Sequence, residues 1–195
     1  MRYFAFVLIV ITSSFASAFQ SLSGTVTRTS SDLYIVISNA HCSRYLLVGA
    51  NEDADNSIRK LSAGDILTAS GTLHESTCKA SLTSVDYVGL KKLLGYWYSN
   101  EGIFTVRDFN YMSFYPMNIK NAQSDPEYYT GDPISYRYSI TPSEGKEWVM
   151  FLSDKESTTF ATLQMYRGYA TMRIYDSDTG QMKKTLRLSK WGELK

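Results

Sequence analysis

The side chains with the most reactive chemistry in this chain of 195 residues are two cysteines, Cys42 and Cys78, and two histidines, His41 and His74. Thiolates and imidazoles are ligands for zinc and copper, so these four side chains could surround one metal ion. His41 and Cys42 are adjacent, however, and adjacent side chains of an extended chain point to opposite faces. Two cysteines in an oxidising compartment can instead form a disulfide, which would withdraw both thiols from a metal. We therefore predict no metal site.

Paired carboxylates offer a second possible chemistry. Asp125 with Glu127, or Asp176 with Asp178, could hydrolyse a glycoside if one member acted as a general acid. Both pairs lie in stretches typical of turns, where acidic residues are common for structural reasons. The sequence contains no nucleophile elbow, phosphate-binding loop, zinc-protease helix or dinucleotide fingerprint. We predict a protein without catalysis or cofactor, and a secreted hydrolase is the enzymatic alternative.

Residues 1–18 have the three-part pattern of a secretory signal peptide. Arg2 supplies the positive start, an apolar core follows from Phe4 to Ile11, and small residues end at Ala18. The apolar core is too short to span a bilayer as a helix. We expect cleavage after Ala18, a secreted or periplasmic protein, and no membrane span.

Composition excludes several classes of protein. Hydrophobic residues make up 44% of the chain, which is too high for a disordered protein, and two cysteines are too few for a disulfide-dense miniature scaffold. Twenty basic side chains against nineteen acidic ones leave a net charge of only +1, which is too small to attract nucleic acid. We expect a monomer that does not bind nucleic acid.

Aromatic residues divide the chain into two parts. Residues 19–94 contain four of them and residues 95–195 contain nineteen. So sharp a change indicates two domains, 19–92 and 93–195, in an all-β protein. The first part contains short β-branched runs between turn signals, and a polar segment that Asp53 or Asp55 could cap as a helix. The predicted elements are strands at 22–29, 33–38, 44–48, 66–73 and 80–88, and a helix within 51–61.

The order of three strands, a short helix and two strands resembles the OB-fold. Residues 61–71, with a Gly64-Asp65 turn followed by Gly71, resemble the fourth strand of many bacterial OB domains. The resemblance covers about 70 residues and implies a small five-stranded barrel in which the third and fifth strands run parallel.

The same resemblance has implications for four side chains. Cys42 and Cys78 come just before the third and fifth strands, so they would lie at the same end of neighbouring strands and form a disulfide. Tyr34 and Tyr45 lie on the second and third strands, the usual binding face of the fold, where they could stack on a base or a sugar.

The second part of the chain alternates apolar and polar residues through a series of hairpins. Ile134, Tyr136, Tyr138 and Ile140 alternate with polar residues, the period of two that a half-buried strand requires. Residues 148–152 are apolar on both faces, so we expect that strand to be covered on its outside. Eight such segments predict an antiparallel up-and-down barrel. They are 96–99, 103–108, 111–115, 134–141, 147–152, 158–166, 169–175 and 182–189.

Gly95-Tyr96-Trp97, at the start of this meander, resembles the Gly-x-Trp motif on the first strand of lipocalins. Lipocalins also carry an arginine near the last strand that packs on this tryptophan, and Arg187 stands in a matching place. The resemblance covers about 100 residues. It implies that Gly95, Trp97 and Arg187 are structural and close the floor of a lipocalin-like barrel.

These patterns predict an exported, non-catalytic binding protein that holds a small apolar or amphipathic ligand inside the aromatic barrel. Phe104, Tyr136, Tyr138 and Met172 are the inward-facing side chains expected to contact the ligand. The alternative is a module of the cell envelope that binds a protein or glycan partner through residues 117–132 and outward-facing tyrosines. A filled barrel with an exposed aromatic patch would favour that alternative.

Overall fold

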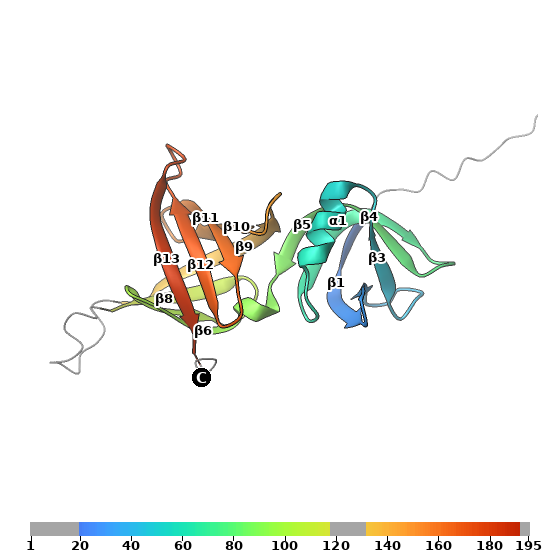
Figure 1. Ribbon diagram of the computed structural model, residues 1–195, viewed down its shortest axis with the longest axis horizontal. Helices are drawn as coiled ribbons and strands as arrows, with labels where there is room; N and C mark the ends of the chain where they lie inside the picture. The colour runs from blue at the N-terminus through green and yellow to red at the C-terminus, as the bar shows by residue number, and fades with distance from the viewer. Residues whose placement is uncertain (1–19, 118–131, 192–195) are drawn as a thin grey trace, which may run out of the picture.

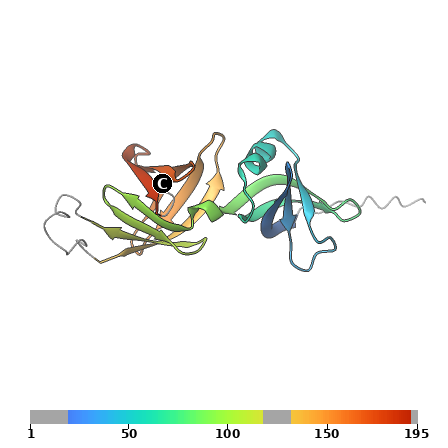
Figure 2. The same ribbon diagram turned by 60° about the horizontal axis from the view of Figure 1, so that its bottom comes forward.

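The computed structural model describes residues 20–117 and 132–191, which form two closed β-barrels (Figure 1). The two barrels lie next to each other along the long axis, and the long strand β5 leads from the first toward the second (Figure 2). The all-β class is thus confirmed. The predicted signal peptide at 1–18 and most of the predicted partner-binding segment at 117–132 lie outside the described residues.

Five strands close the first barrel in the order β1-β2-β3-β5-β4, and β4 pairs back with β1. Strands β3 and β5 are parallel neighbours, whereas all the other neighbours are antiparallel. The predicted five-stranded barrel with one short helix is confirmed. Its strands are β1 (Gln20–Thr29), β2 (Asp32–Val36), β3 (Tyr45–Gly49), β4 (Ile66–His74) and β5 (Lys79–Gly89).

The predicted disulfide is also confirmed. Cys42 and Cys78 are bonded, and their Cα atoms are 5.8 Å apart. Parallel neighbours start at the same end of a sheet, so residues just before β3 and β5 lie side by side. Both thiols are in the bond, which leaves them unable to ligate a metal. The described part of the chain contains no group of three or more His, Cys, Asp or Glu side chains that could hold an ion.

The α-helix of the described residues, α1 (Glu52–Lys60), lies between β3 and β4 and buries Ala54 and Ile58. Asn51 caps it, since its side-chain oxygen accepts a hydrogen bond from the Ala54 amide at 2.8 Å. The expectation that Asp53 or Asp55 is the cap is wrong. Both lie within the helix, whereas Asn51 has the extended backbone that an N-cap requires.

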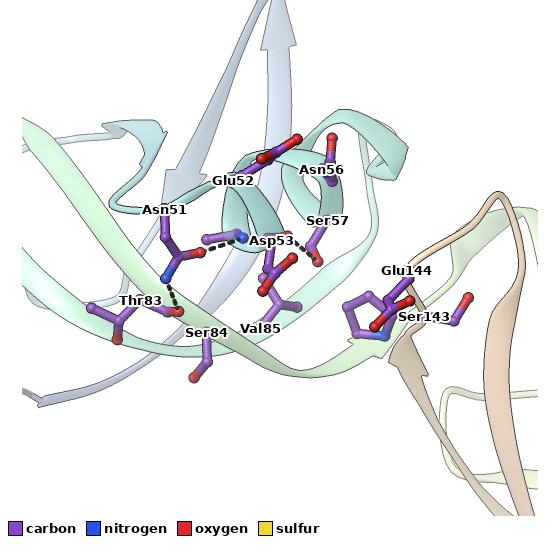
Figure 3. A pocket seen from close by; sticks show the side chains of 12 residues that line it. Asn51, Glu52, Asp53, Asn56, Ser57, Thr83, Ser84, Val85, Ser143 and Glu144 are labelled. Carbon is purple, nitrogen blue, oxygen red and sulfur yellow. Dashed lines mark hydrogen bonds between the residues drawn. The ribbon is translucent and has the colours of Figure 1, made fainter.

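Replacing Asn51 by alanine is expected to lower the free energy of unfolding by about 1 kcal/mol, because the Ala54 amide loses its acceptor. The Asn51 side chain also donates from Nδ2 to the Thr83 carbonyl at 3.0 Å, which ties the helix to β5 (Figure 3). Urea unfolding measures the change. Asn56→Ala removes the same type of side chain from the body of the helix, and an equal loss in both variants would contradict the capping role.

Eight antiparallel strands close the second barrel, each paired with the next in sequence. The last strand returns to the first through the pairs Ser189–Tyr98 and Lys190–Trp97. The predicted up-and-down barrel is confirmed. Its strands are β6 (Gly95–Ser99), β7 (Gly102–Val106), β8 (Tyr111–Pro116), β9 (Ile134–Pro142), β10 (Trp148–Ser153), β11 (Thr158–Met165), β12 (Tyr169–Tyr175) and β13 (Met182–Lys190).

The outer face of β10 is open at Phe151, which is 43% exposed, contrary to the expectation that this face is covered. The first barrel approaches the turn before β10 instead. Lys60, at the end of α1, donates from Nζ to the carbonyls of Ser143 and Glu147. The contact between the barrels therefore leaves the outside of β10 free at this position.

The join between the barrels is short and packed. It consists of the end of β5 and a turn of 3-10 helix, η1 (Lys91–Leu93). The Tyr87 hydroxyl donates to the Phe109 carbonyl at 2.7 Å, and a Cβ at Gly89 would lie 2.7 Å from the Phe109 ring. The buried residues of both barrels form one connected core through this join. The division of the chain into two domains, at 19–92 and 93–195, stays a prediction.

Candidate functional site

The four side chains expected to contact a ligand belong to the core of the second barrel. Phe104, Tyr138 and Met172 are at most 6% exposed, and Tyr136 is half-buried. The Tyr138 hydroxyl donates to the Asp108 carbonyl at 2.7 Å. Burial raises the pKa of this phenol above its ordinary value, and the nearby Tyr87 and Asp108 raise it further. Their contact with a ligand stays a prediction.

Burial around these side chains indicates how the barrel interior is filled. Ligand cavities usually have volumes of about 300–1,000 Å³ and would leave accessible surface on the side chains that line them. Trp97, Met150, Leu163 and Met172 have at most 1% of their surface accessible. At these positions the interior side chains pack against protein, as in a close-packed core.

The three residues expected to be structural have separate roles. Gly95 has φ of +120°, a conformation that side chains rarely adopt, so glycine is required there. Trp97 is buried and donates from Nε1 to the Leu93 carbonyl at 2.7 Å. The cation over its ring is Lys190, 5.4 Å from the centroid.

The expected packing of Arg187 on Trp97 is wrong. Arg187 lies over the Tyr169 ring, 5.8 Å from its centroid. Its neighbours Leu186 and Leu188 are buried in the barrel, so strand alternation directs Arg187 outward. Trp97 is on the inner face and cannot meet it.

The carboxylate pairs offer little support for hydrolysis. Asp176 accepts hydrogen bonds from the amides of Asp178 and Thr179 and pairs with Lys183 at 2.6 Å. The Lys183 side chain and these turn donors hold the pKa of Asp176 well below its usual range. A general acid requires the opposite shift. Asp125 and Glu127 lie outside the described residues.

The two tyrosines on the possible binding face of the first barrel are already engaged. Tyr45 is completely buried, and its hydroxyl accepts a hydrogen bond from the Cys42 amide at 3.1 Å. Tyr34 is half-buried beneath Arg44, whose guanidinium carbon lies 4.5 Å from the ring centroid. The face therefore does not present the pair of open rings that the sequence suggested.

A groove lined by exposed aromatic side chains lies on the outside of the second barrel. We call it the aromatic groove, a depression of about 350 Å³ on strands β6 to β8 and the residue that follows β13. Tyr96 and Trp191 are 55% and 63% exposed, which is unusual for side chains of this size. Its lining residues are Tyr96, Ile103, Thr105, Arg107, Tyr115 and Trp191.

Strand register explains how the groove is built. Ile103, Thr105 and Arg107 alternate along β7 and its end, so they share the outer face and form the floor. Tyr96 is paired with Thr105, and Tyr115 is paired with Ile103, which places one ring on each side of this floor. Thr105 is only 5% exposed although it faces outward, as expected for a floor residue between larger side chains.

Closure of the barrel adds Trp191 to this site. Its amide donates to the Tyr96 carbonyl at 2.9 Å, and its ring stacks on Tyr98 with centroids 4.6 Å apart. These contacts hold the indole beside the groove while most of its surface stays open to solvent. Sequence reasoning identified outward tyrosines as a possible surface but missed this group.

A second, polar groove of about 560 Å³ lies between the start of α1, β5 and the turn after β9 (Figure 3). Its polar groups largely bond within the protein: Ser57 donates to the Asp53 carbonyl at 2.8 Å and Ser143 to the Glu147 carbonyl at 2.6 Å. Three carboxylates also line it, but an acidic rim alone does not specify a ligand.

Within the described residues, no helix is both long and apolar enough to cross a membrane. Comparison of the chain with protein-family models, with curated proteins and with solved structures finds no match.

Proposed function

We propose that this chain is an exported, non-catalytic binding protein that holds a saccharide in the aromatic groove. The observation that carries the proposal is the exposure of Tyr96 and Trp191 beside a floor that contains Thr105 and Arg107. Large exposed aromatic groups on a soluble protein mark a site of interaction.

The chemistry of the groove suits a sugar better than a purely apolar ligand. A pyranose has an apolar face of C–H groups that packs on an aromatic ring, and a rim of hydroxyl groups that needs hydrogen-bond partners. Tyrosine and tryptophan combine a rigid apolar surface with a polar tip, so they can contact both parts of a sugar. Thr105 and Arg107 add further hydrogen-bonding groups to the floor.

The interior of the barrel provides less support for a small apolar ligand. Phe104 stacks on Phe114 with centroids 4.5 Å apart, and Met172 has no accessible surface. A ligand there would have to displace packed side chains, whereas the groove is already open. The proposed function therefore uses the outside of the barrel.

Export is supported by the sequence pattern at 1–18 and by the disulfide, which persists in oxidising compartments. The parallel β3–β5 pairing supports kinship of the first barrel with OB-folds. The eight-stranded meander with Trp97 on its first strand likewise supports a lipocalin-like second barrel. We therefore include in the proposal that the first barrel is related to OB-folds and the second barrel to lipocalins.

Tyr96→Ala and Trp191→Ala are each expected to weaken saccharide binding about 10- to 30-fold, because truncating an anchoring aromatic side chain costs on the order of 1.4–2 kcal/mol. Glycan-array screening of the full chain followed by calorimetry of the best oligosaccharide measures the change. Tyr166→Ala, which removes a 40% exposed tyrosine that follows β11 and does not line the groove, is the matched control. Unchanged affinity in both groove variants would reject the proposal.

A second candidate, contact with another protein, is favoured by an apolar row on the outside of β10 to β13. Cross-strand pairing places Phe151, Phe160, Tyr175 and Met182 side by side. Phe151 and Met182 are 43% and 56% exposed, and Phe160 stacks on Tyr175. This row offers apolar area without the hydrogen-bonding floor of the groove, which suits a protein surface more than a sugar.

A further inference from the structure

We infer that the aromatic groove selects a saccharide that carries a carboxylate, and that Arg107 binds this carboxylate. The inference rests on the proposed function and names the class of sugar that the same groove would take. It follows from the charge, the geometry and the length of the groove.

Charge is the first argument. Arg107 is the only charged side chain among the described residues that line the groove. The adjacent carboxylate, Asp108, is used in the turn after β7, where it accepts hydrogen bonds from the amides of Asn110 and Tyr111 at 2.8 and 2.7 Å. No ion pair in the described part of the chain involves Arg107. Its positive charge is thus available to a ligand.

The chemistry of the guanidinium group is the second argument. Arginine presents N–H donors in a planar fork that matches the two oxygens of a carboxylate. A neutral sugar hydroxyl has a single oxygen, so it can accept from only part of this set of N–H donors. The groove therefore combines rings for the apolar face of a sugar with a donor group suited to an acidic substituent.

The position of Arg107 is the third argument. Ile103, Thr105 and Arg107 follow one another at every second position, so the floor extends for about 14 Å at roughly 3.4 Å per residue. Tyr115 flanks the Ile103 end and Tyr96 flanks the middle, which leaves Arg107 at the other end. This length accommodates a short oligosaccharide whose acidic unit lies at the Arg107 end.

The test uses the full chain and a panel of uronic-acid trisaccharides that differ in stereochemistry, each with its methyl ester. Esterification removes the charge and leaves the sugar ring in place. Isothermal calorimetry is expected to show at least one acid that binds about tenfold more tightly than its ester, in line with a charge-assisted hydrogen bond. Arg107→Gln should weaken binding of that acid about tenfold more than binding of its ester, so that the acid loses its advantage over the ester.

Arg137→Gln is the matched control, because Arg137 also lies by an exposed tyrosine of this barrel, 5.4 Å from the Tyr111 centroid, but outside the groove. The thermal midpoint of each variant checks that the fold is retained. Equal affinity for acids and esters would overturn the carboxylate inference while leaving the saccharide proposal intact. If no acid or ester binds, and neutral glycans also fail on the array, both are overturned.

Discussion

Replacing Trp97 by alanine is expected to lower the free energy of unfolding by about 3–5 kcal/mol, the usual cost of truncating a large buried side chain to alanine. Trp97 is 1% exposed, and its indole N–H donates to the Leu93 carbonyl at 2.7 Å. The substitution leaves a cavity in the second barrel and a carbonyl without its donor at the join. Chemical unfolding followed by circular dichroism measures the loss.

Two other variants make this prediction specific. Trp191→Ala removes the same type of side chain from a site that is 63% exposed and is expected to change stability by less than about 1 kcal/mol. Trp97→Phe keeps most of the apolar volume and should fall between wild type and Trp97→Ala, which gives a measurable result even if the alanine variant does not fold. Similar losses for Trp97→Ala and Trp191→Ala would refute the assignment of Trp97 to the core.

Removing the disulfide is expected to have the second-largest effect. The double variant Cys42→Ser/Cys78→Ser should lose about 3–4 kcal/mol, since the bond closes a loop with a sequence separation of 36 residues and restricts the unfolded chain. The bond also links the starts of β3 and β5, the parallel pair that connects two parts of the first barrel. Urea unfolding under non-reducing conditions measures the difference.

Reduction of the wild-type protein provides an independent check. Wild type in excess dithiothreitol should approach the stability of the double variant, and the reductant should have no effect on the variant itself. An identical unfolding midpoint for reduced and oxidised wild type would show that the bond adds no stability.

The strands of both barrels could be predicted from sequence because their signals are local. The alternation of Tyr138 and Ile140 with polar residues locates a half-buried strand without knowledge of its neighbours. The turn signals between segments likewise separate one strand from the next. The predicted parallel pairing of β3 and β5 came from the OB-fold resemblance, and the Cys42–Cys78 bond agrees with it.

Local signals could not decide which side chains meet across the barrel. Arg187 was expected on Trp97, but the final strand register turns it outward and brings Lys190 to that ring. The capping residue of α1 also depended on the position at which the extended backbone after β3 becomes helical. The helix starts at Glu52, so Asn51 is the cap and the nearby aspartates lie inside the helix. One-residue differences of this type exchange the faces of a strand or shift the start of a helix.

The amino-acid sequence by itself determined the all-β class, the number and approximate bounds of the strands, and a net charge of only +1, since these follow from composition and from a period of two. Only the tertiary structure decided that Trp191 lies beside Tyr96 and that Arg107 and Tyr115 share a groove with them. These residues are brought together when β13 closes on β6 and when β7 pairs with both of its neighbours. Such contacts depend on the register and closure of the whole barrel, which no short stretch of sequence encodes.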